Sequence, residues 1–123
     1  MKLHDYITER LGRPFAWGEH DCVLFAIGWL KVATGHDYLT PYKPWSTAFE
    51  AARKVAGAGG LDALFDEHLE AINPHLAVDG DLAIIRGTAH LFTGAHVVSV
   101  GEEGLLFKDR LEVEYAWTHR NKK

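Results

Sequence analysis

The chain has 123 residues, of which 47% are hydrophobic and 24% are charged, a composition typical of one compact domain, residues 1–123. Its formal net charge of −4 provides no field that would attract nucleic acid or an anionic membrane. The basic C-terminal residues Arg120, Lys122 and Lys123 are therefore expected to be a solvated tail. The single cysteine excludes an intramolecular disulfide and a Cys-rich zinc site and fits a reducing compartment.

The first half of the chain predicts helices. Helical spacing of apolar residues predicts a first helix that ends at Gly12, carried by Leu3, Ile7 and Leu11. Residues 15–20 are expected to form a short ordered loop. From residue 22 the sequence is apolar nearly all round, typical of a central helix buried on most sides. Asp21 is its predicted N-cap, and Thr34-Gly35 its end.

The next segments are less regular. Residues 36–45 contain two prolines and three aromatics, which predicts a packed surface loop. Thr47 and Glu50 have capping-box spacing, so a helix is expected from there to about Val55. A short helix is predicted over residues 61–69, closed by Asn73-Pro74.

After residue 79 the pattern changes to short strands. Residues 79–81 predict a turn, and strands are expected at 82–85, 90–93, 95–100, 105–107 and 113–117. Glycines separate three of these strands as tight turns would. This order, with helices in the first half and an antiparallel sheet in the second, predicts an α+β fold rather than alternating βαβ units.

Cys22 is the residue most able to do chemistry. The reactive species is the thiolate, and a position just after an N-cap favours a negative sulfur through the backbone N–H groups and the helix dipole. The competing interpretation is structural, because free cysteine is among the most buried residue types. A cysteine nucleophile also needs a base. His90 and His96, on successive predicted strands, are the two candidates, and each could instead be a strand histidine with no chemical role.

Several segments resemble the NlpC-type, papain-like cysteine peptidases. The segment 15–22, Phe-Ala-Trp-Gly-Glu-His-Asp-Cys before an apolar helix, is similar to their nucleophile segment, and 79–85 resembles their Gly-Asp strand. Residues 17–26, 34–37, 80–81 and 116–117 are most similar to a phage and prophage branch of mostly unassigned function. The resemblance covers roughly residues 13 to 118, and it implies a papain-like domain whose nucleophile helix packs on a C-terminal antiparallel sheet.

The resemblance also implies roles for individual residues. Cys22 would be the nucleophile and His90 the general base, while the family's third polar residue falls near Val98, which cannot orient a histidine. His96, two residues away, is the substitute, and a permuted arrangement with His96 as the base stays open. The Cys22 backbone N–H would help stabilise the oxyanion. Asp21 is expected to cap the helix beside this site, and Trp17 to line the substrate groove.

The resemblance implies hydrolysis of an amide bond in the peptide part of peptidoglycan. The setting would be a phage tail, with other tail proteins as partners and the virion, or the bacterial cytoplasm before assembly, as location. Residues 1–10 carry no signal-peptide pattern, and no apolar run approaches membrane-spanning length. No cofactor is expected, and no metal either, because the adjacent residues His20, Asp21 and Cys22 point in different directions.

Two other functions remain open from the sequence. One is a structural protein of the tail tip that keeps the fold and has weak or no catalysis, which the absent polar residue near Val98 favours. The other is acyl transfer or amide hydrolysis on another substrate, since papain-like folds host many reactions.

Overall fold

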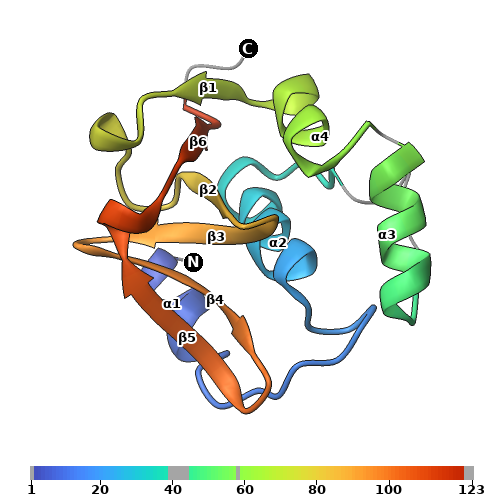
Figure 1. Ribbon diagram of the computed structural model, residues 1–123. Coiled ribbons are helices and arrows are strands. Elements are labelled where there is room, and N and C mark those ends of the chain that lie inside the picture. The colour runs from blue at the N-terminus through green and yellow to red at the C-terminus, as the bar shows by residue number, and fades with distance from the viewer. Residues whose placement is uncertain (1, 39–44, 58, 121–123) are drawn as a thin grey trace.

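The computed structural model describes residues 2–38, 45–57 and 59–120. In this part of the chain, four α-helices precede a six-stranded antiparallel sheet, an α+β fold (Figure 1). The helices are α1 (Leu3–Thr8), α2 (Cys22–Thr34), α3 (Ala48–Gly57) and α4 (Leu61–His68). None of these helices is long and apolar enough to cross a membrane.

The sheet has the strand order β1-β6-β2-β3-β4-β5, and every neighbouring pair is antiparallel. The strands are β1 (Glu70–Ile72), β2 (Leu82–Ile85), β3 (Thr88–Thr93), β4 (His96–Gly101), β5 (Gly104–Asp109) and β6 (Tyr115–Thr118). The last strand of the chain therefore inserts between the first two, whereas β2 to β5 follow one another as hairpins. This insertion ties the C-terminal end of the described chain to the segment after α4 (Figure 1).

Helix α2 begins and ends where the sequence predicts. The Asp21 side chain accepts a hydrogen bond from the Leu24 backbone N–H at 2.9 Å, which makes it the N-cap. Gly35 takes the left-handed conformation with φ 81° and donates to the Lys31 carbonyl, which is the usual helix stop for glycine. One half of the predicted capping box is present, because the Glu50 N–H donates to the Thr47 hydroxyl at 3.1 Å, while the Glu50 carboxylate accepts from the Ser46 N–H at 3.4 Å.

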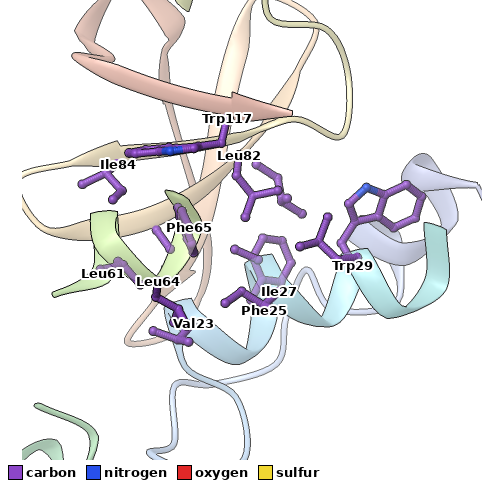
Figure 2. Packing of buried hydrophobic residues seen from close by; sticks show 14 of the residues in the cluster. Val23, Phe25, Ile27, Trp29, Leu61, Leu64, Phe65, Leu82, Ile84 and Trp117 are labelled. Carbon is purple, nitrogen blue, oxygen red and sulfur yellow. The ribbon is translucent and has the colours of Figure 1, made fainter. Parts of the chain in front are cut away.

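The core has two layers, one on each face of the sheet. The larger layer lies between the sheet and the helices, where α2 and α4 pack side chains such as Phe25, Phe65 and Leu64 against Leu82 and Trp117 (Figure 2). The smaller layer covers the opposite face and contains Ala77, Ala83, Ile85, Phe92, Val97, Val113 and Ala116. Both faces are thus apolar over the central strands β2 to β4, whose sequences are nearly continuous hydrophobic runs rather than alternating ones.

Several local predictions were wrong. Helix α1 ends at Thr8, because the residues after it form turns with hydrogen bonds over three residues, such as Arg10 N–H to the Ile7 carbonyl at 3.0 Å. The predicted short helix over 61–69 is confirmed as α4, which ends at His68, but the three-residue strand β1 that follows it was not predicted. The predicted loop at 36–45 lies mostly outside the described residues.

The expectation of a solvated basic tail was wrong for Arg120. Its guanidinium donates two hydrogen bonds to the Asp81 carboxylate, from Nη2 at 2.9 Å and from Nε at 3.3 Å. Asp81 is fully buried and also accepts from the Thr118 hydroxyl at 2.8 Å and the Val78 N–H at 2.9 Å. A buried carboxylate needs such partners because it has left water. Arg120 therefore holds the end of β6 to the start of β2. Lys122 and Lys123 lie outside the described residues.

The Arg120 pair predicts a stability effect. Arg120→Gln should lower the free energy of unfolding by about 1–3 kcal/mol, less than for a fully buried pair because the arginine side chain is 43% exposed. Urea denaturation measures this loss, with Arg53→Gln on the exposed side of α3 as the control, expected within about 0.5 kcal/mol of the wild type. Equal midpoints for the two variants would contradict this role of Arg120.

Candidate functional site around Cys22

A compact loop delivers the chain to the start of α2. Ala16 and His20 exchange backbone hydrogen bonds of 3.0 and 2.8 Å, so residues 16–20 close into a turn. Gly18 lies inside it with φ 79°, a conformation that glycine adopts without steric cost. A Cβ at this position would lie 1.8 Å from the Trp45 carbonyl oxygen. The loop and the segment at Trp45 therefore pack backbone against backbone.

The Asp21 carboxylate joins these segments to α2. Besides the Leu24 N–H, it accepts the Gly18 N–H at 3.0 Å and the Trp45 indole N–H at 2.7 Å. Asp21 is fully buried, and three neutral N–H donors occupy its two oxygens. It acts as a helix cap and a clamp, as the sequence predicts for the cap, and it does not present a free carboxylate to a ligand.

Trp17 lies on the surface of the same loop. Its side chain is 37% exposed, and its ring packs edge-on against Phe15 with 4.7 Å between centroids. This indole is accessible on the surface of the loop that precedes Cys22, and its place in a substrate groove stays a prediction.

Cys22 is the first residue of α2 and is half-buried against the main core. Burial raises the pKa of its thiol above the ordinary value, and the nearby Asp21 charge acts in the same direction. Backbone hydrogen bonds from Ala89, Val23 and Cys22 itself oppose the rise but do not cancel it. The helix N-terminus was expected to favour the thiolate, and burial outweighs that effect. The thiol is therefore protonated at neutral pH.

The strand position that meets Cys22 is Ala89 on β3. Helix α2 packs on β3 and β4, and Ala89 belongs with Leu91 to the core layer on the helix side. Because successive strand residues point to opposite faces, His90 points to the other side of the sheet. Its partner across the ladder is Ala83, which lies with Phe92 in the layer on that far face. The sheet thus separates His90 from Cys22.

His90 is integrated into the far side of the sheet. It is 1% exposed, and its Nδ1 lies 2.8 Å from the Thr88 carbonyl oxygen. Burial is the main cause that lowers the pKa of His90, while the hydrogen bond to Thr88 partly opposes it. The ring is accordingly a neutral, buried strand histidine.

His96 faces the helix side but lies at the far end of the strands. It is exposed and pairs with Thr93, four residues along β3 from Ala89. At the ordinary rise of a strand, this offset is roughly 13 Å, well beyond hydrogen-bond reach of the thiol. Val98, where a third polar residue was sought, is fully buried in the core. The structure therefore does not bring Cys22, His90 and His96 together.

Sequence reasoning missed two residues that shape this site. Trp45 was assigned only to a loop, and no local pattern connects it to Asp21, which is 24 residues away. Ala89 was left outside the predicted strand, which was expected to begin at His90. In the structure, β3 begins at Thr88. Among the described residues, no group of three or more His, Cys, Asp or Glu side chains could hold a metal ion.

The fold defined so far is a single-cysteine α+β domain whose helix start is clamped by a buried carboxylate. A family model described as a domain of unknown function, DUF6950, matches residues 1–119, and the chain belongs to this family. No curated protein matches the chain.

The tight contact at Gly18 predicts a difference between two glycines. Gly18→Ala should lower the free energy of unfolding by about 3 kcal/mol or more, because the new Cβ collides with the Trp45 backbone and adds to the strain of positive φ. Gly35→Ala is the matched control: its φ of 81° is nearly the same, but a Cβ there meets nothing within 4 Å. It should cost about 1–2 kcal/mol, the strain of positive φ alone. Equal losses in urea denaturation would refute the backbone contact at Gly18.

Proposed function

We propose that this chain is a non-catalytic member of the NlpC-type, papain-like superfamily and serves as a structural component of a phage tail tip. The observation that carries this proposal is the identity of the strand residue beside the thiol, which is Ala89 rather than a histidine. A cysteine nucleophile requires a base within hydrogen-bond reach. Neither His90 nor His96 meets that condition.

The arrangement of α2 supports the superfamily part of the proposal. The sequence resembles NlpC-type peptidases in the Trp-Gly loop, the Asp-Cys pair and the Gly-Asp strand. In the structure, Cys22 opens a buried helix that packs on an antiparallel sheet, which is the arrangement that the resemblance implies. The phage setting, with other tail proteins as partners, rests on the same resemblance.

Peptidoglycan hydrolysis remains the second candidate. The observation in its favour is the fixed position of the sulfur, since the capped start of α2 would hold a nucleophile rigidly. In this reaction the thiolate would attack the amide carbonyl, the C–N bond would break as the protonated amine leaves, and water would hydrolyse the resulting thioester to a carboxylic acid and the free thiol. The raised pKa of the Cys22 thiol disfavours it, because little thiolate is present at neutral pH.

The state of the thiol is testable by alkylation against pH. We expect the iodoacetamide rate of the wild type to rise only above the pH at which a cysteine-containing peptide reacts, since burial and Asp21 disfavour the thiolate. His90→Ala and His96→Ala should leave the inflection unchanged. The readout is the position of the inflection, and Cys22→Ser gives the unlabelled blank.

The proposal would be contradicted, and the hydrolase favoured, by a different result. In that result, the alkylation rate of the wild type has its inflection at a lower pH than that of the peptide, and His90→Ala or His96→Ala moves the inflection to higher pH. A direct assay separates the two functions. Purified peptidoglycan incubated with the wild type and with Cys22→Ala should release the same background of soluble fragments. Release that depends on Cys22 would establish catalysis.

A further inference from the structure

A groove lies on the side of α2 that faces away from Cys22. Residues of α1, the loop 13–20 and α2 line it, and its volume is about 330 Å³, within the range of small-ligand sites. Leu24, Gly28 and Lys31 follow one another at helical spacing and form its α2 wall. Cys22 precedes Leu24 by two residues, about 200° around the helix axis. The groove is therefore separate from the thiol.

Two arginines at this groove have guanidinium N–H groups that donate to no described residue. The Arg10 guanidinium is held 3.7 Å from the centre of the Tyr6 ring, and its Nη1 donates to the Tyr6 carbonyl at 2.9 Å and to Glu9 at 3.3 Å. Within the described chain, its Nε and Nη2 make no hydrogen bond. The Arg13 side chain likewise has no hydrogen bond or ion pair with a described residue. Lys31 differs, because it pairs with Asp37 at 3.8 Å.

His20 supplies an independent sign of a ligand. It lines the same groove and is only 3% exposed, yet its Nε2 is buried without a hydrogen-bond partner among the described residues. A buried polar atom without a partner is unfavourable, and native structures hold few of them. Its ring packs edge-on against Phe25 at 6.2 Å, which fixes the ring but does not satisfy the nitrogen.

The geometry points to a binding site for an oxyanion group, a carboxylate or a phosphate carried by a ligand, with Arg10 and Arg13 as cationic donors and His20 as the third donor. Guanidinium forks match both anions in two-point geometry. Arg10 is already fixed on Tyr6, so little side-chain freedom is lost when it binds.

Binding should be coupled to a proton on His20. In the free protein, burial, Arg13 and Arg10 lower the pKa of His20, and Asp21 raises it. An anion between the arginines would offset their charge, so the pKa of His20 should rise on binding and affinity should increase as pH falls. The charged groups that face or line this region are Arg10, Arg13, Glu19, Asp21, Lys31 and Asp37. The two acids that line the groove, Glu19 and Asp37, limit it to small anionic groups rather than polyanions.

NMR titration of the intact protein tests the site. Sodium acetate and sodium phosphate are added separately at constant ionic strength with sodium chloride as balance, while the His20 ring and Arg13 amide signals are followed. We expect saturable shifts with at least one anion and a rise in the pKa of His20. Arg13→Gln, at an exposed position, should weaken binding about tenfold. Arg53→Gln, another exposed arginine on α3, should leave it unchanged.

The two anions distinguish the kinds of ligand. A saturable shift with acetate alone indicates a ligand with a carboxylate, and one with phosphate alone indicates a ligand with a phosphate. Saturable shifts with both anions support a site that accepts either group. No saturable shift with either anion overturns the inference. So does equal binding by Arg13→Gln and the wild type, or the same shift with chloride. Cys22 takes no part in this measurement, so its result is independent of whether the thiol is catalytic.

Discussion

The buried Asp21 carboxylate is the interaction on which the arrangement around α2 depends. A charged group that is fully buried must find hydrogen-bond donors to replace water, and Asp21 finds three in three segments: the loop at Gly18, the first turn of α2 at Leu24, and the indole of Trp45. One side chain thereby sets where the helix starts, how the preceding loop closes and where the segment before α3 docks. Because a Cβ at Gly18 would collide with the Trp45 backbone, this packing of the loop requires glycine at that position.

The hydrogen bonds of Asp21 fix Cys22 in a position suited to a nucleophile, but the surroundings that they create disfavour the reactive thiolate. This clamp places Cys22 rigidly at the start of a helix, as catalysis would require. It also puts a negative charge next to the sulfur and buries it against β3, and both raise the pKa of the thiol. In a thiol enzyme, a protonated histidine would offset these effects. Here Ala89 occupies the facing strand position, so nothing on β3 compensates the burial.

The sequence predicts the elements of this fold better than their arrangement. Local signals suffice for α2, which Asp21 and Gly35 delimit, and for β2, whose bounds at 82–85 match. Strand β1 has three residues, two of them exposed, and so carries no alternation to detect. The insertion of β6 between β1 and β2 is a long-range pairing that no local pattern encodes. The contact from Trp45 to Asp21 was missed for the same reason.

The position of His90 shows why a candidate site is harder to predict than its strand. Both faces of this sheet are apolar, so the pattern of β3 does not tell which set of alternate residues meets α2. The choice depends on partners elsewhere in the chain: Leu91 packs with Val98 on the helix side, and Phe92 packs with Val97 on the far side. Bringing His90 to Cys22 would require a one-residue shift of β3 that moves both buried pairs to the wrong layers. No rotamer change can do this, so the separation of histidine and thiol is a property of the core itself.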